Sequence, residues 1–227
     1  MIAVVQARFT SARLPGKVLR AMAGKPLLGW LIERLRAARR VTRIVVATST
    51  EESDDAIAGY ARQEDVDCYR GSLSEVASRL TAAAERANAE AFVRVNGDSP
   101  LVAPAVVDDI IALFQCAQPD LATNVQLRTF PKGFSVEAIS VASLRRARTM
   151  MRPGEQEHVT GVFYRCPEQF RIVNLTSGND WGAVQLSVDT AEDFWLVERM
   201  LANGPDRNAS VSELVKLRER CLADVVA

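Results

Sequence analysis

Three cationic side chains, those of Arg8, Arg13 and Lys17, follow the first apolar run of the chain at residues 2–5. Guanidinium and ammonium groups bind phosphate oxygens strongly, and arginine adds a forked pair of donors. Ser11 lies among them and offers a hydroxyl group. A buried strand that ends in a loop of this kind is typical of a phosphate site, so we expect these residues to bind the phosphates of a nucleotide.

The elements that must position these residues follow from the spacing of apolar side chains. In the first half of the chain we expect strands at residues 2–5, 43–48, 66–69 and 91–95, with helices between them, the longest at residues 74–89. An alternation of strands and helices implies right-handed crossovers and a mostly parallel sheet. The sequence therefore predicts an α/β fold, and we expect one domain over residues 1–227.

The second half of the chain is less regular. Short apolar runs predict strands at residues 121–125, 134–139, 170–175 and 184–188. Two segments, Thr190-x-x-Asp193 and Ser210-x-x-Glu213, are similar to capping boxes and predict helices directly after them.

Ligands of an open α/β sheet bind beyond the carboxyl ends of its strands. The loops that follow the predicted strands of the first half are residues 8–17, 48–50, 70–72 and 96–100. We expect these four loops to converge on one crevice. The pattern of a P-loop, GxxxxGK[ST], is not met, because Val18 follows Gly16-Lys17, and no GxGxxG is present.

Charge is balanced overall and uneven along the chain. There are 28 basic and 28 acidic residues, but residues 1–43 hold ten basic residues against one acid. This asymmetry favours an anionic ligand near the first third of the chain. The balanced total and the lack of interleaved aromatic residues argue against nucleic acid as a partner.

The remaining composition excludes other classes. The four cysteines form no CxxC pair and the chain has one histidine, so a structural zinc site is not expected. Free thiols favour a reducing, cytoplasmic location. No apolar run approaches the roughly 20 residues needed to cross a bilayer, and no signal peptide is visible, so we expect no membrane partner.

Several motifs, taken in order, resemble those of one enzyme family. The segments QARFTSARLPGKVL, VRVNGDSPL, EHVT and SVDTAEDFW resemble the SpsF-type cytidylyltransferases of spore coat polysaccharide biosynthesis, and are similar to CMP-Kdo synthetases. The resemblance implies a Rossmann-like, three-layer fold of the glycosyltransferase A type. It also implies transfer of CMP from CTP to a sugar or sugar-acid acceptor with release of pyrophosphate, in surface polysaccharide or nucleotide-sugar biosynthesis. The related synthetases imply a possible homodimer.

The resemblance also implies roles for individual residues. The catalytic set is Arg13, Lys17, Asp98 and Asp189, with Asp98 and Asp189 as ligands of Mg²⁺. Mg²⁺ prefers oxygen and usually takes one or two carboxylates together with phosphates. The expected nucleotide-binding residues are Gln6, Ala7, Arg8, Ser11, Arg13, Lys17, Arg70, Ser72, Asn96 and Gly97. The expected acceptor-binding residues are Arg128, Glu137 and His158.

Each of these roles has a structural alternative. Asp98 lies among turn-forming residues, and Asp189 could be an acid at the start of a helix. His158, which follows Glu157, could bind the carboxylate of an acceptor, relay a proton, or cap a helix. Glu137 could lie on the exposed face of an edge strand.

The chain departs from the family pattern at Phe9, Thr10, Ala12, Ser135 and Gly161. Ser135 stands where the family usually has an acid, which leaves the acceptor open. Two other functions fit parts of the pattern. A glycosyltransferase that uses a nucleotide sugar would usually carry a DxD pair, and residues 96–98 hold one acid. A nucleotide sensor without catalysis would bind CTP and not turn it over.

Overall fold

The central strand of the protein is β1 (Ile2–Gln6), and the sheet around it has seven strands in the order β5-β4-β1-β6-β8-β7-β9. The structure, a computed structural model, describes residues 1–226 and the side chains of residues 1–224. The other strands of this sheet are β4 (Arg43–Ser49), β5 (Asp67–Gly71), β6 (Ala91–Asn96), β7 (Leu121–Thr123), β8 (Val136–Ser140) and β9 (Ile172–Asn174). Strands β2 (Ala21–Met22) and β3 (Lys25–Pro26) form a separate hairpin.

The sheet is mostly parallel, as the alternation of strands and helices predicts. Pairs β1·β4, β1·β6, β4·β5 and β7·β9 are parallel, and β8 runs antiparallel to both of its neighbours. The predicted α/β class, a three-layer Rossmann-like fold, is confirmed. Parallel strands place their carboxyl ends at one edge, so β1, β4, β5 and β6 all end on the same side of the molecule.

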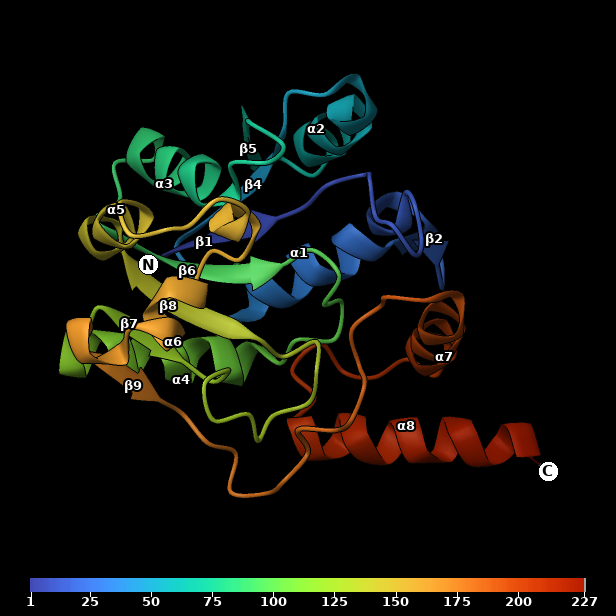
Figure 1. Cartoon of the computed structure of the whole chain (residues 1–227). Coiled ribbons are helices and arrows are strands. Elements are labelled where there is room, and N and C mark those ends of the chain that lie inside the picture. Colours follow the sequence, from blue (N-terminus) through green and yellow to red (C-terminus); the bar gives the residue numbers. More distant parts are fainter. Residues whose placement is uncertain (227) are drawn as a thin grey trace.

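Helices cover both faces of the sheet, which gives the three layers seen in Figure 1. The helices are α1 (Leu27–Ala37), α2 (Asp55–Gln63), α3 (Val76–Arg86), α4 (Pro104–Ala117), α5 (Val141–Arg148), α6 (Gly161–Arg165), α7 (Ala191–Ala202) and α8 (Val211–Val226). Apolar residues of α3, α5 and α6 pack in one cluster, and those of α1, α4, α7 and α8 pack in another. None of the described helices combines the length and apolar character that a membrane crossing requires.

Alternation along the strands explains the two clusters. In β1, Ala3 and Val5 belong to one cluster and Ile2 and Val4 to the other. A strand with apolar residues on both faces is expected at the centre of a sheet that helices cover on both sides. The short apolar run at the start of the chain therefore forms the rigid base of the loop that follows it.

The capping boxes are present in the structure. Thr190 accepts a hydrogen bond from the backbone of Asp193 at the start of α7, and Asp193 accepts one from the backbone of Thr190. Ser210 and Glu213 make the same reciprocal pair before α8. Both helices therefore begin where the sequence predicts.

The strand predicted at residues 184–188 is wrong. This segment makes a single bridge, between Gln185 and Lys132. Gly133 follows Lys132 with a positive φ of 97°, and a Cβ built on it would lie 2.6 Å from the backbone of Leu186. The segment that holds Lys132 and Gly133 turns away at this point, so its pairing with residues 184–188 does not extend into a ladder.

Candidate active site

The loop after β1 is held in shape by its own backbone and by a buried aspartate. Gly16 donates a hydrogen bond to the carbonyl of Phe9 over 2.8 Å, and its φ is 72°. A Cβ on Gly16 would lie 2.9 Å from the ring of Phe9. The backbone N–H of Phe9 in turn donates to Asp54, over 2.7 Å. Only glycine fits this turn, and the turn places Lys17 at the start of a short 3₁₀ helix, Lys17–Leu19.

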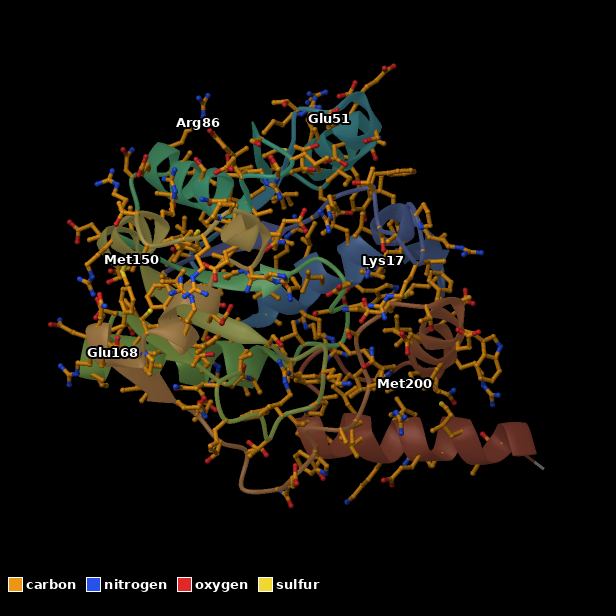
Figure 2. The ribbon with its side chains drawn as sticks, in the orientation of Figure 1. Lys17, Glu51, Arg86, Met150, Glu168 and Met200 are labelled. Carbon is orange, nitrogen blue, oxygen red and sulfur yellow. The ribbon has the colours of Figure 1, made fainter. Side chains whose placement is uncertain are left out.

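Lys17 is buried and joins the two predicted metal ligands. Its Nζ lies 3.1 Å from Oδ2 of Asp98 and 3.1 Å from Oδ1 of Asp189. It also donates to the carbonyl oxygen of Val188, over 2.6 Å. Figure 2 shows Lys17 inside the molecule, whereas Arg86 and Glu168 lie at the periphery. Two acids that are far apart in the sequence thus meet at one ammonium group.

Arg13 completes this end of the site. Its Nη2 lies 3.0 Å from Oδ1 of Asp189, and its side chain is largely exposed. Burial alone would raise the pKa of Asp189, but the charges of Lys17 and Arg13 outweigh it and lower that pKa below its usual value. The carboxylate is therefore ionised at neutral pH and able to bind a cation.

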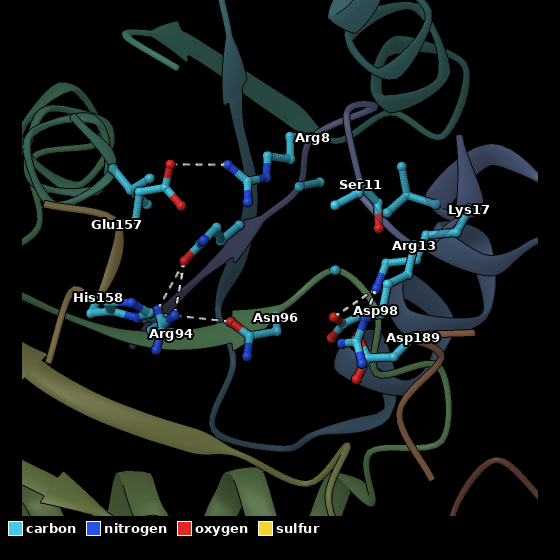
Figure 3. Close-up of a pocket in the computed structure, with 16 residues that line it drawn as sticks. Arg8, Ser11, Arg13, Lys17, Arg94, Asn96, Asp98, Glu157, His158 and Asp189 are labelled. Carbon is cyan, nitrogen blue, oxygen red and sulfur yellow. Dashed lines mark hydrogen bonds and ion pairs between the residues drawn. The ribbon is translucent and has the colours of Figure 1, made fainter. Parts of the chain in front are cut away.

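Asp98 lies in a turn, as its structural alternative states, and its side chain also contacts Lys17. The acids in the first turn of α7 are Glu192 and Asp193, and Asp189 lies before that helix. Its side chain faces Lys17 and Arg13 (Figure 3). Asp189 lies one residue before the N-cap Thr190, so it has this pair of cationic contacts in addition to its place next to the helix start.

A second polar cluster surrounds Arg94 on β6. Its Nε and Nη2 donate to Oε1 of Gln6 over 3.1 and 2.9 Å, and Nη2 also donates to Oδ1 of Asn96 over 3.0 Å. Its Nη1 pairs with the carboxylate of Glu137. Tyr164 donates to the other oxygen of Glu137, over 2.6 Å. Burial and the Glu137 carboxylate both raise the pKa of the Tyr164 hydroxyl, so it stays protonated.

The segment between α5 and α6 approaches the cavity from the other side. Arg8 pairs with Glu157 over 3.5 Å (Figure 3), and His158 lines the same cavity as Arg94. Helix α6 is preceded by Thr160 and has no side-chain cap. The alternative in which His158 caps this helix is therefore wrong.

These groups line one cavity of about 440 Å³. Its lining is Gln6, Ala7, Arg8, Ser11, Ala12, Arg13, Lys17, Val18, Val76, Arg94, Asn96, Gly97, Asp98, Glu157, His158 and Asp189. The structure thus brings together eleven of the residues predicted from sequence. They come from the end of β1 and the loop after it, from the end of β6 and the turn after it, and from two segments of the second half of the chain.

Four predicted residues do not line the cavity. Arg70 is turned toward the start of α2, where it pairs with Asp55 over 2.6 Å. Ser72 accepts a hydrogen bond from the backbone of Glu75, before α3. Arg128 donates to the hydroxyl of Ser135, over 3.2 and 3.3 Å. The ligand contacts expected of Arg70, Ser72 and Arg128 stay predictions.

Glu137 is the fourth of these residues. It lies on β8, which has a strand on each side, and it is 1% exposed. The alternative in which Glu137 lies on the exposed face of an edge strand is wrong. Among the described residues, the cavity-lining side chain to which Glu137 is bonded is that of Arg94, and a direct contact of Glu137 with an acceptor stays a prediction.

Arg94 is the main residue that the sequence reading missed. It lies in the apolar strand AFVRV, and Glu137 lies in the apolar run FSVEAIS. The two are register partners across β6 and β8. Two lone residues of opposite charge in two apolar strands are a signal for pairing, because a buried charge needs a partner.

The sheet, the cation-bearing loop and the two acids that converge on Lys17 define a nucleotidyltransferase of the Rossmann-like, glycosyltransferase A type. A family model described as cytidylyltransferase matches residues 2–177. The chain belongs to the cytidylyltransferase family, whose members transfer CMP from CTP, and this agrees with the resemblance seen in its motifs.

Similar proteins agree with this assignment. The spore coat polysaccharide biosynthesis protein SpsF of Bacillus subtilis is 29% identical over 96% of this chain and 93% of its own length. A 3-deoxy-manno-octulosonate cytidylyltransferase of Acidobacterium capsulatum is 32% identical over 88% of this chain and 96% of its own length.

Among solved structures, a cytidylyltransferase of Leptospira borgpetersenii superposes with a TM-score of 0.93 at 28% identity, over 98% of this chain and 94% of that one. A CMP:2-keto-3-deoxy-manno-octonic acid synthetase, complexed with CTP, superposes with a TM-score of 0.66 at 17% identity, over 89% of this chain and 98% of that one. The second likeness supports the fold alone.

Proposed function

We propose that this cytidylyltransferase uses Mg²⁺ held by Asp98 and Asp189 to transfer CMP from CTP to a sugar or sugar-acid acceptor. The observation that carries the proposal is the shared ammonium: both carboxylates lie 3.1 Å from Nζ of Lys17, so both can reach one cation. Among the described residues no group of three or more metal-binding side chains is found. Two carboxylates, completed by phosphate and water oxygens, are the donor set that Mg²⁺ commonly takes.

The protein's own groups stabilise the charge of the reaction. Arg8, Arg13 and Lys17 bind the phosphate oxygens of CTP, and Lys17 and Arg13 offset the charge that develops on the departing pyrophosphate. Asp98 and Asp189 would hold Mg²⁺, which would supply Lewis-acid chemistry for the attacking hydroxyl and the phosphate. The rigid loop after β1 keeps these donors in place before the substrate arrives, which lowers the cost of reorganisation.

The acceptor lies at the end of the cavity that carries His158 and Glu157. A neighbouring relative is described as a 3-deoxy-manno-octulosonate cytidylyltransferase, which favours a sugar acid here. The imidazole of His158 can donate to a carboxylate, and Glu157 can accept from hydroxyl groups. Arg128, beside Ser135, is a further candidate for the anionic group of a longer acceptor.

The test is release of pyrophosphate from CTP and Mg²⁺ with a panel of sugar acids that includes 3-deoxy-manno-octulosonate. Asp98→Asn removes one charged oxygen at the metal site, and we expect it to lower kcat/KM by about 100-fold or more. The matched control is Asp65→Asn, because Asp65 is exposed after α2 and has a φ of 52° that asparagine tolerates. Full activity of Asp98→Asn, or full activity in EDTA, would contradict the metal assignment.

A further inference from the structure

The side-chain amides of Gln6 and Asn96, here called the amide pair, have a fixed orientation. Both amide oxygens accept hydrogen bonds from the guanidinium of Arg94. A guanidinium has N–H donors and no acceptor, so an amide that faces it must present its oxygen. The two NH₂ groups of the amide pair therefore point away from Arg94.

Arg94 is itself held by buried partners. Glu137 pairs with its Nη1, and Tyr164 and Thr123 extend the chain of hydrogen bonds, since the Tyr164 hydroxyl lies 2.8 Å from Oγ1 of Thr123. The side chains of Arg94 and Glu137 are 13% and 2% exposed. Four of the five guanidinium N–H groups are used in these bonds. The guanidinium is thus a fixed support for the amide pair.

The NH₂ groups of the amide pair are free to bind a ligand. Gln6 and Asn96 both line the cavity, and within residues 1–224 no protein group accepts a hydrogen bond from either amide nitrogen. The two residues are register partners on β1 and β6, so their backbones are about 4.8 Å apart. Figure 3 shows Asn96 between Arg94 and the acids Asp98 and Asp189.

We propose that the amide pair binds the 2′- and 3′-hydroxyl groups of the ribose of CTP, and that Arg94 and Glu137 are positioning residues for it. The inference rests on the proposed function, because it takes CTP as the nucleotide. Arg8, Arg13 and Lys17 supply charged donors for the phosphates in this cavity. The amide pair is neutral and is supported by an ion pair without net charge, so it remains available for the uncharged hydroxyl groups. Asn96 lies two residues before Asp98, and the ribose is bonded to the phosphate that must reach that aspartate.

The experiment compares CTP with 2′,3′-dideoxy-CTP by calorimetry in the presence of Mg²⁺. The dideoxy nucleotide cannot make the two neutral hydrogen bonds, so we expect the wild-type protein to bind CTP about tenfold more tightly or better. In Asn96→Leu and in Gln6→Met we expect this ratio to fall to about threefold, because one hydrogen bond remains. A change that only alters the charge or fold of the cavity would shift both nucleotides equally and leave the ratio unchanged.

The positioning role is tested with the double variant Arg94→Met/Glu137→Gln. Removing both charges avoids a buried, unpaired carboxylate that could prevent folding. We expect the ratio between the two nucleotides to fall to about threefold or less, although neither residue touches the ribose. The matched control is Arg145→Met/Glu85→Gln. It removes a surface ion pair, in which Nη2 of Arg145 lies 2.8 Å from Oε1 of Glu85, and it should keep the wild-type ratio.

Two results would overturn the inference alone: equal affinity of the wild-type protein for both nucleotides, or a wild-type ratio in the double variant. Failure of the wild-type protein to bind either nucleotide would overturn the proposed function, and the inference with it. A fall in the ratio in the surface control would show that any lost ion pair has this effect, and would also contradict the assigned role of Arg94.

Discussion

Lys17 stabilises two carboxylates that would otherwise repel each other. Without a ligand it contacts both Asp98 and Asp189, and it is 7% exposed. In the proposed function the same ammonium also binds phosphate oxygens of CTP. One side chain would thus link the stability of this carboxylate pair to the affinity for the substrate.

Replacing Lys17 by methionine should destabilise the protein in a pH-dependent way. Asp189 has a lowered pKa in the folded protein, so its contribution is present above its unfolded value of about 3.8 and is lost as pH falls through the folded value. We expect Lys17→Met to lower the free energy of unfolding by about 1–2 kcal/mol at pH 7, and the loss to shrink below pH 4. Urea unfolding at pH 7 and pH 3.5 measures this difference.

Lys132→Met is the control for that measurement, because Lys132 is exposed. It should change stability by less than about 0.5 kcal/mol at either pH. A loss in Lys17→Met that is equal at both pH values would show that packing, and not the charge of Lys17, supports the site.

Residue types at the cation-bearing loop could be predicted from the sequence, because Arg8, Arg13 and Lys17 follow a buried strand directly. The approach of Asp98 and Asp189 to one ammonium group, that of Lys17, depends on the fold. That the two acids share a site was expected from the family motifs. Arg94 was missed because its partner Glu137 lies on a strand that is distant in the sequence. Its role depends on the register of β6 and β8, which no local pattern encodes.

At the scale of elements, Asp54 connects the loop after β1 to the end of β4. It is fully buried, and it accepts hydrogen bonds from the backbone of Phe9, and from the backbone and hydroxyl of Ser49. Burial would raise the pKa of Asp54, but these hydrogen bonds lower it below its usual value. The carboxylate fixes the loop that carries Arg13 and Lys17.

Asp54→Asn should therefore weaken both the fold and the site. The NH₂ group of asparagine cannot accept the hydrogen bond that a carboxylate oxygen accepts from a backbone N–H, so one bond is lost and two donors face each other. We expect this to lower the free energy of unfolding by about 1–3 kcal/mol. We expect this loss above pH 4, and a smaller difference at lower pH, where Asp54 of the wild type becomes protonated. Denaturant unfolding as a function of pH measures it.

The neighbouring Asp55→Asn serves as control, since Asp55 is 60% exposed and pairs with Arg70 at the surface. It should cost less than about 1 kcal/mol. Equal costs for the two substitutions would mean that the hydrogen bonds of Asp54 do not fix the loop.

The elements of the first half could be predicted because each strand is an apolar run and each helix follows it with helical spacing. The strand predicted at residues 184–188 was wrong for a tertiary reason. Its neighbour is a loop in which Gly133 turns away, so its apolar residues are buried without a strand partner. Hydrophobic pattern reports burial, and burial is not specific to strands.

At the scale of the whole molecule, the cavity is made by parts that are distant in the sequence. Lys17 and Arg13 come from the first loop, Asp98 from the end of β6, and Asp189 from the segment before α7. The cavity therefore exists only when the sheet, α7 and the first loop are in place. A ligand that binds all three parts binds the folded state and not the unfolded chain.

This coupling predicts a nucleotide-dependent rise in thermal stability. A ligand at 100 times its Kd stabilises the native state by about 2.7 kcal/mol. For a chain of this length, 1 kcal/mol corresponds to roughly 2–4 °C, so CTP with Mg²⁺ should raise Tm by roughly 5–10 °C. If Asp98 and Asp189 hold the cation as proposed, EDTA or Asp98→Asn should reduce the rise to a small fraction, whereas Asp65→Asn should keep it. An equal rise with CTP in EDTA would show that Arg8, Arg13 and Lys17 bind the phosphates without a metal, and would separate the phosphate site from the metal site.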